Sequence, residues 1–258
     1  MKAKLILSAL LFASCGLAQA QQTQVIAHQG FWNTPGAARN SIASLVKADS
    51  IGCYGSEFDT GITTDGQIVV NHDETFRGVI QQAATSKVCT SIRLDNGEYL
   101  PLLKQYAEKA KELNVRLILE LKPHKTFKQE TRAAEEIVRI IKEAGLEKRT
   151  EYISFSRHAV KELIRLAPKG SPVYYLNGDI APQVLKAWGC AGADYRLEVW
   201  QEHPEWIKEC HDLGMKVNVW VVDNEQDLRW LIDQKVDFIT TDNPLLLQKL
   251  LKEKSNSL

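Results

Sequence analysis

Residues 115–145 read VRLILELKPHKTFKQETRAAEEIVRIIKEAG and contain one complete strand–helix unit. Val115–Glu120 is a short apolar run with branched residues, which is typical of a buried parallel strand. Glu130–Ala144 repeats apolar residues at helical spacing, and Gly145 supplies a stop signal. A strand followed by an amphipathic helix is the building unit of parallel α/β folds.

The same unit recurs along the chain. Seven more short strands are predicted, at Val25–His28, Gly55–Asp59, Tyr152–Phe155, Val173–Leu176, Ala193–Leu197, Val217–Val222 and Phe238–Thr241. Helices are expected between and after the strands, at Ser41–Ser50, Leu102–Leu113, Glu130–Ala144, His158–Leu166, Pro182–Trp188, Pro204–Leu213, Glu225–Gln234 and Leu245–Lys252. Eight units in one chain of 258 residues predict a single (β/α)₈ TIM barrel. A doubly wound open sheet is the rival fold, but no Gly-x-Gly-x-x-Gly loop follows the first strand.

Two segments interrupt the repeat. Gln67–Asn71 is expected to form an extra short strand after the turn Thr64-Asp65-Gly66. The stretch from Thr75 to Leu100 is long for a connection, and we expect it to lie over the barrel mouth as a small insertion.

The amino terminus has the pattern of a secretory signal peptide. Lys2 and Lys4 precede the mostly apolar run Leu5–Phe12, and Ala18-Gln19-Ala20 is an A-x-A cleavage site. We therefore expect residues 1–20 to be a signal peptide, residues 21–258 to be one barrel domain, and the protein to be periplasmic or secreted. The alternative is a lipoprotein attached through Cys15.

The charge balance limits the classes of binding partner, and the cysteine content limits the possible disulfides. Lys+Arg and Asp+Glu both number 32, so no basic surface for nucleic acid is indicated, and no stable membrane insertion or protein partner is implied. Export would permit a disulfide between Cys190 and Cys210, which end neighbouring predicted helices, but buried free thiols are an equally good interpretation.

Three acidic residues fall at the ends of adjacent strands, where a barrel keeps its active site. Glu57 and Asp59 are two apart on one strand and share a face, and Glu120 ends the next barrel strand. Oxygen donors without cysteine suit one hard divalent cation, Mg²⁺ or Ca²⁺. The alternative is that these acids form salt bridges with Lys122 and neighbouring arginines.

Two histidines also stand at strand ends. His28 and His72 lie beside the acidic cluster and have the chemistry of a general acid and a general base. Lys122 is placed to supply positive charge to phosphate oxygens. The other histidines are interpreted as structural: His124, His158, His203 and His211.

Taken together, these motifs resemble the glycerophosphodiester phosphodiesterase family. The matching segments run from the first strand to the last: His28-Gln29-Gly30, Arg39-Asn40-Ser41, Glu57-Phe58-Asp59, Thr64-Asp65-Gly66, Val69-Val70-Asn71-His72-Asp73, Ile118-Leu119-Glu120-Leu121-Lys122, Val219-Trp220-Val221-Val222-Asp223 and Phe238-Ile239-Thr240-Thr241-Asp242-Asn243-Pro244. The resemblance implies hydrolysis of a small-molecule phosphodiester to glycerol 3-phosphate and an alcohol.

The resemblance also implies roles for individual residues. It makes Glu57, Asp59 and Glu120 the metal ligands and His28 and His72 the acid–base pair. The substrate or phosphate would be contacted by Lys122, Trp220 and Arg39.

The chain departs from the family pattern at two positions. The family has arginine where this chain has Gln29, and glutamate where it has Arg39. We expect Arg39 to replace the missing guanidinium; a solvated Arg39, or one paired with an acid such as Asp73, is the alternative.

Three other functions fit parts of the pattern. A related phospholipase-D-like phosphodiesterase acting on sphingomyelin or lysolipids would share the barrel, metal and histidines. A binding protein that has lost turnover would not need to keep all five groups. A glycosidase would use two carboxylates but not paired histidines.

Overall fold

The computed structural model describes residues 22–256, so the expected signal peptide and Cys15 lie outside the described residues. Eight parallel strands form the barrel: β1 Gln24–Ala27, β2 Gly55–Ile62, β6 Arg116–Leu121, β7 Thr150–Ser154, β8 Val173–Tyr175, β9 Gly192–Arg196, β10 Lys216–Trp220 and β11 Phe238–Thr241. Their order is β1-β11-β10-β9-β8-β7-β6-β2, and pairing of β1 with β2 closes the ring. The predicted TIM barrel is confirmed.

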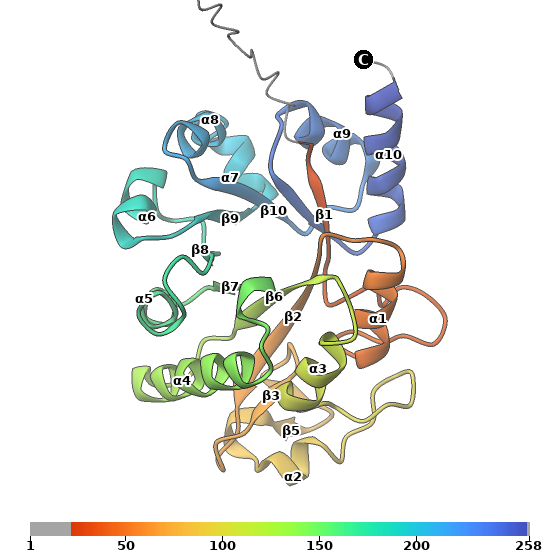
Figure 1. Cartoon of the computed structure of the whole chain (residues 1–258), viewed down its shortest axis with the longest axis vertical. Coiled ribbons are helices and arrows are strands. Elements are labelled where there is room, and N and C mark those ends of the chain that lie inside the picture. Colours follow the sequence, from red (N-terminus) through yellow and green to blue (C-terminus); the bar gives the residue numbers. More distant parts are fainter. Residues whose placement is uncertain (1–21, 257–258) are drawn as a thin grey trace, which may run out of the picture.

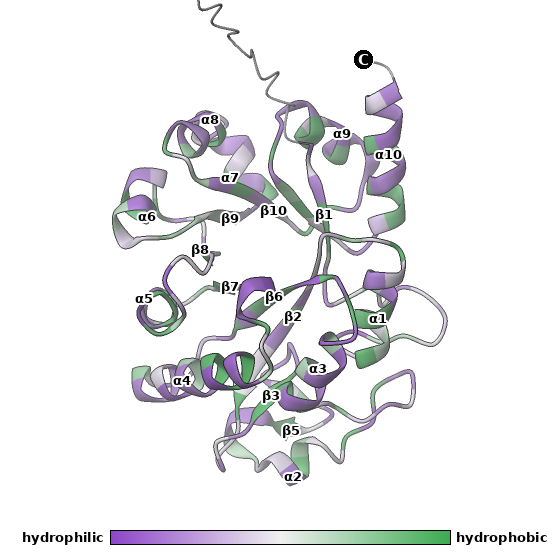
Figure 2. Ribbon diagram, in the orientation of Figure 1, coloured by the Kyte–Doolittle hydropathy of each residue, from purple (hydrophilic) through white to green (hydrophobic). Residues whose placement is uncertain are grey.

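Helices surround the strands (Figure 1). They are α1 Ile42–Ser50, α3 Leu103–Ala110, α4 Phe127–Glu143, α5 Arg157–Leu166, α6 Pro182–Trp188, α8 Glu205–Asp212, α9 Glu225–Asp233 and α10 Pro244–Asn256. Most carry both apolar and polar residues, as expected when one face packs on the barrel (Figure 2). Side-chain caps explain where several helices begin. The Ser41 side chain accepts a hydrogen bond from the Ser44 amide, and the Thr126 side chain accepts one from the Gln129 amide.

Element boundaries differ from the sequence prediction in a few places. The strand expected over Ala193–Leu197 ends at Arg196, because the additional helix α7 (Leu197–Glu202) begins at once. Helix α4 begins at Phe127 rather than Glu130, since Thr126 caps it one turn earlier. Gly145 ends it with φ of 70°, a conformation that glycine adopts at no steric cost.

The segment after β2 forms a small side structure. Strand β3 (Ile68–Val70) returns antiparallel to β2. It is followed by the hairpin β4 (Thr75–Phe76) and β5 (Val79–Ile80), the short helices η1 (Gln81–Ala83) and α2 (Ser86–Cys89), and loop residues up to Leu100. A separate apolar cluster joins this insertion to Val69 of β3. It therefore lies beside β2 and β3, at the lower end of Figure 1, and borders one side of the mouth.

Two further expectations concern cysteines and membranes. Cys53, Cys89, Cys190 and Cys210 are buried free thiols, so the Cys190–Cys210 disulfide that the sequence allowed is not formed. Among residues 22–256, no helix combines the length and apolarity needed to cross a bilayer.

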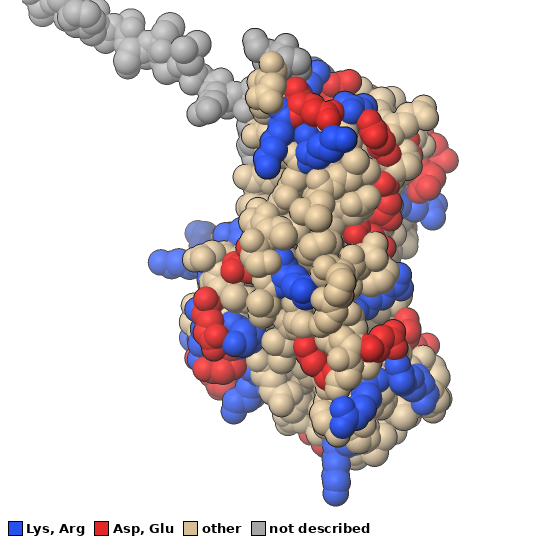
Figure 3. Space-filling view, turned by 90° about the vertical axis from the view of Figure 1, so that its right-hand side faces the viewer, with Lys and Arg blue, Asp and Glu red and all other residues tan. Residues whose placement is uncertain are grey.

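On the face shown in Figure 3, basic and acidic side chains are interspersed, and neither sign forms a continuous patch.

Candidate active site

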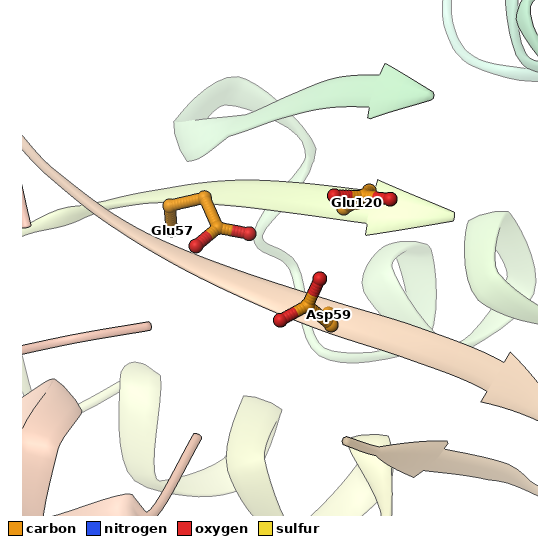
Figure 4. Close-up of side chains that lie close together, drawn as sticks. All are labelled: Glu57, Asp59 and Glu120. Atoms are coloured by element: carbon orange, nitrogen blue, oxygen red, sulfur yellow. The ribbon is translucent and has the colours of Figure 1, made fainter. Parts of the chain in front are cut away.

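Three buried carboxylates meet at the middle of β2 and the end of β6 (Figure 4). Glu57 and Asp59 share one face of β2, and Asp59 stands opposite Glu120 in the β2–β6 register. Each residue is at most 6% exposed, and one oxygen from each lies within 4.8 Å of the others. Phe58 turns outward and packs against Tyr106 of α3. The alternation predicted for β2 thus places both carboxylates inside the barrel.

One lysine forms ion pairs with two of the three acids. Lys122 Nζ lies 3.0 Å from Glu120 Oε1 and 3.4 Å from Asp59 Oδ1. The salt bridge considered from the sequence is therefore present, but a single positive charge faces three carboxylates. A divalent cation would balance the remainder.

The shifts in the pKa values of these acids reflect the same excess of negative charge. Burial, followed by the charges of Asp59 and Glu120, raises the pKa of Glu57 well above its ordinary value. Burial and Asp59 raise the pKa of Glu120 to about 8. Burial also acts to raise the pKa of Asp59, but Lys122, His72 and a hydrogen bond from Asn40 together lower it. Three oxygen donors with excess negative charge fit a hard divalent cation.

Gln29 and Asn40 hold two of these carboxylates in place. The Gln29 amide N–H donates to Glu57 Oε2 at 2.8 Å, and its side-chain Nε2 donates to Asp59 Oδ2 at 3.1 Å. Asn40 Nδ2 also donates to Asp59 Oδ2, at 2.9 Å, and Asn40 Oδ1 accepts from the Asp59 amide. Gln29 therefore supports the carboxylates. Asn40 was part of a matched motif but had been given no role, since its partner is distant in sequence.

The two predicted histidines stand on either side of this cluster. His28 Nδ1 lies 2.8 Å from Asp242 Oδ1, and Trp32 Nε1 donates to the same oxygen at 2.8 Å. Asp242 thus fixes the His28 ring, a role that the sequence motif did not reveal. His72 Nδ1 contacts Asp73 Oδ1 at 2.9 Å, and both side chains are half-exposed.

These groups line a cavity of about 220 Å³ inside the barrel mouth. Its charged and titratable lining includes His28, Glu57, His72, Glu120 and Lys122. The rest of the lining is largely apolar and includes Ile153, Phe155, Leu176 and Trp220. Phe155 and Trp220 meet edge to face with ring centroids 5.4 Å apart. The cavity is therefore suited to a ligand with an anionic end and a short carbon chain.

A wider hollow of about 710 Å³ adjoins this cavity at His72. Gln29, Trp32 and Arg39 line it together with residues of the insertion. The Arg39 guanidinium carbon lies 4.3 Å from the Trp32 ring centroid, which is a cation–π arrangement. Arg39 is exposed and faces this hollow, and its charge also lowers the pKa of Asp242.

The remaining histidines have structural partners. His124 Nε2 accepts from the Ile62 amide at 3.0 Å, and His158 pairs with Thr131. His211 pairs with Asp237, and His203 stacks on Trp206. None of the four lines the cavity.

Comparison with known proteins gives a consistent result. The model of the glycerophosphoryl diester phosphodiesterase family matches residues 28–246. A glycerophosphodiester phosphodiesterase of Caldanaerobacter subterraneus subsp. tengcongensis is 27% identical over 252 residues, covering 90% of this chain and 99% of the relative. A crystal structure of a glycerophosphodiester phosphodiesterase from Parabacteroides distasonis is 49% identical, with a TM-score of 0.89, and the match covers 91% of this chain and 99% of that one. An Oleispira antarctica phosphodiesterase, solved with its product sn-glycerol-3-phosphate, shares the fold at 23% identity and a TM-score of 0.75, over 90% of this chain and 97% of that one.

Proposed function

The chain belongs to the glycerophosphoryl diester phosphodiesterase family and is thus a phosphoric diester hydrolase, and we propose that it hydrolyses glycerophosphodiesters to glycerol 3-phosphate and an alcohol with the help of one divalent cation. The observation that carries this proposal is the cavity itself. Glu57 and Glu120 of the carboxylate trio, one lysine and two histidines surround a space of about 220 Å³, and the third carboxylate, Asp59, lies within 4.8 Å of the other two.

Glu57, Asp59 and Glu120 would hold Mg²⁺ or Ca²⁺ through their oxygens. When bound, such an ion polarises a phosphoryl oxygen as a Lewis acid. Lys122 lies beside two of the carboxylates and would donate to a phosphate oxygen from the same wall. Gln29 and Asn40 each donate one hydrogen bond to the Asp59 carboxylate, and Asn40 Oδ1 accepts a third from the Asp59 amide.

His28 and His72 would share the proton transfers. One takes the proton of the attacking hydroxyl, from water or from a neighbouring glycerol hydroxyl, and the other gives a proton to the leaving alcohol oxygen. Asp242 orients His28 and Asp73 contacts His72, so each ring is held through Nδ1. Trp220 would pack against the carbon chain of the glycerol moiety.

Arg39 would serve the substrate from the wider hollow. Its stacking on Trp32 positions the guanidinium in the hollow that adjoins His72, where a phosphate or the alcohol group can reach it. Arg39→Ala should lower kcat/KM by about 10²-fold, the scale of one preorganised phosphate donor. Unchanged kcat/KM in this variant would contradict the role of Arg39 in substrate binding.

The proposal is tested with a panel of purified glycerophosphodiesters, assayed before and after chelator treatment and again with Mg²⁺ or Ca²⁺ restored. Release of glycerol 3-phosphate that is lost with chelator and regained with metal supports it. Full activity after chelation would refute the metal dependence. Comparing glycerophosphocholine with lysophosphatidylcholine and sphingomyelin as substrates separates this activity from a phospholipase-D-like one.

Residues 1–20 would act as a signal peptide that exports one barrel domain, residues 21–258, to the periplasm or medium. Amino-terminal sequencing of the exported protein tests this. A mature chain beginning at Cys15 would indicate a lipoprotein instead.

A further inference from the structure

A fourth buried carboxyl, outside the metal-binding trio, lines the catalytic cavity. Asp194 lies on β9, is 1% exposed and faces the same 220 Å³ space as Glu57 and Glu120. Its strand neighbours Ala193 and Tyr195 belong to the core between the barrel and its helices, so Asp194 points to the barrel interior. The proposed hydrolysis gives this residue no task.

The bonding of Asp194 is incomplete. Its Oδ1 atom is buried and has no hydrogen-bond partner. Asn218 contacts the carboxyl, and no described residue forms an ion pair with it. Asn218 Nδ2 also donates to Thr240 Oγ1 at 3.0 Å, and no described donor faces the free oxygen. A buried polar atom without a partner costs folding free energy, and such atoms are expected where a ligand completes the bond.

The surroundings of Asp194 indicate what that ligand carries. Ile153, Leu176 and Trp220 form apolar walls beside it, and the Trp220 ring is fixed by its Nε1 donating to the Asp194 carbonyl at 2.9 Å. Burial, together with the charge of Glu151, raises the pKa of the Asp194 carboxyl to about 7, although a hydrogen bond from Asn218 acts to lower it. The apolar walls and the single free acceptor atom suit a short carbon chain that ends in a hydroxyl.

We infer that Asp194 hydrogen-bonds the terminal hydroxyl of the glycerol moiety and makes the enzyme select glycerophosphodiesters over diesters that lack this hydroxyl. The inference rests on the proposed function. In the ring order of the strands, β9 stands across the barrel from β2. With the phosphate end held by Lys122 and the carboxylate trio, the hydroxyl farthest from phosphorus therefore extends toward Asp194. A hydroxyl both donates and accepts, so this bond forms with the neutral or the ionised carboxyl.

The test compares two ligands that differ only in that hydroxyl, glycerol 3-phosphate and propane-1,2-diol 1-phosphate. Calorimetry on the metal-loaded full chain should show about 10-fold tighter binding of glycerol 3-phosphate. Asp194→Ala should bring the two affinities within about twofold and leave that of the propanediol phosphate within about threefold. Asp194→Asn, which keeps one acceptor and the shape, should retain a preference of at least about threefold.

Asp237→Asn is the matched control, because Asp237 is also a buried aspartate but is paired with Lys216 and does not line the cavity. It should keep the full preference. Equal binding of both ligands by the wild type overturns the inference whether or not the alanine variant folds. Equal weakening of both ligands in Asp194→Ala also overturns it, since that pattern marks a structural role.

The two levels of the proposal fail in different ways. If no glycerophosphodiester is hydrolysed and glycerol 3-phosphate does not bind, the proposed function is wrong. If turnover is normal but the preference for glycerol 3-phosphate persists in Asp194→Ala, only the role of Asp194 is wrong.

Discussion

Buried carboxylates occupy both ends of this barrel, but their charges are balanced at only one end. Near the amino-terminal end, Glu151 of β7 is 3% exposed and accepts hydrogen bonds from Arg116 Nε at 2.7 Å and from the Tyr54 hydroxyl. Asp237, just before β11, accepts from Lys216 Nζ at 2.8 Å and contacts His211 at 3.0 Å. Each of these acids has at least one cationic partner and further hydrogen bonds.

At the carboxyl-terminal end, the ion pairs within residues 22–256 give Asp59 and Glu120 one shared cation, Lys122, and give Glu57 none. Burying charge without full compensation opposes folding. The contrast therefore separates two uses of the same residue type. Paired acids serve the structure, and the unbalanced acids form the site that we propose a divalent cation and a phosphodiester complete.

The largest effect should follow from removing one acid of the unbalanced cluster. Glu57→Gln keeps the shape but removes a metal ligand, so metal affinity should collapse and kcat/KM should fall by at least about 10³-fold. Without metal, the variant should unfold at the same or higher denaturant concentration, because a repelling charge has been removed. Metal titration, kinetics and denaturant unfolding measure the three quantities. Retention of metal binding would remove Glu57 from the ligand set.

The histidines should show the next largest effect. His28→Ala and His72→Ala should each lower kcat by at least about 10²-fold, the scale of one general acid or base. Since both serve one reaction, the double variant should be little slower than either single variant. His124→Ala is the matched control: its imidazole accepts from the Ile62 amide outside the cavity, so kcat should stay near the wild-type value. A wild-type rate in the His28 or His72 variant would contradict the role of that residue as a general acid or base.

The unbalanced end should also respond to pH. The pKa of Glu120 is raised from its ordinary value of 4.5 to about 8, so the folded metal-free protein holds a proton that the unfolded chain has lost. The contribution of Glu120 to the stability of the metal-free protein is therefore full below about pH 4.5 and falls as the pH rises to about 8. Metal displaces this proton, so metal affinity should rise by up to about tenfold per pH unit over the same range. Thermal unfolding with and without metal measures both trends, and a metal affinity independent of pH would contradict the prediction.

The sequence was sufficient to predict the barrel because the strand–helix repeat is local. The prediction missed helix α7, where Leu197 begins a helix with no loop after β9. The insertion borders the mouth, but its packing beside β3 through the apolar cluster around Val69 was not predicted. Such packing between distant segments leaves no signal in a local pattern.

The site shows the same division. Glu57 and Asp59 were predicted to lie together because residues two apart on a strand share a face. Asp242 and Asp194 received no role, because the partners that define them, His28 and the cavity wall, come from distant strands. Gln29 was interpreted as a loss of phosphate binding, but its hydrogen bond to Asp59 shows a supporting role that its residue type alone did not indicate.

The smallest effect on activity should come from the balanced end. Glu151→Gln leaves the partly buried Arg116 guanidinium without its anion, which should lower the free energy of unfolding by about 1–3 kcal/mol. The double variant Glu151→Gln/Arg116→Gln should recover part of that loss, because no unpaired charge remains. In both variants kcat/KM, measured well below the unfolding temperature, should stay within about threefold of wild type. If Glu151→Gln instead reduced kcat/KM as strongly as Glu57→Gln, the two ends of the barrel would be coupled, and the division between structural and functional acids would not hold.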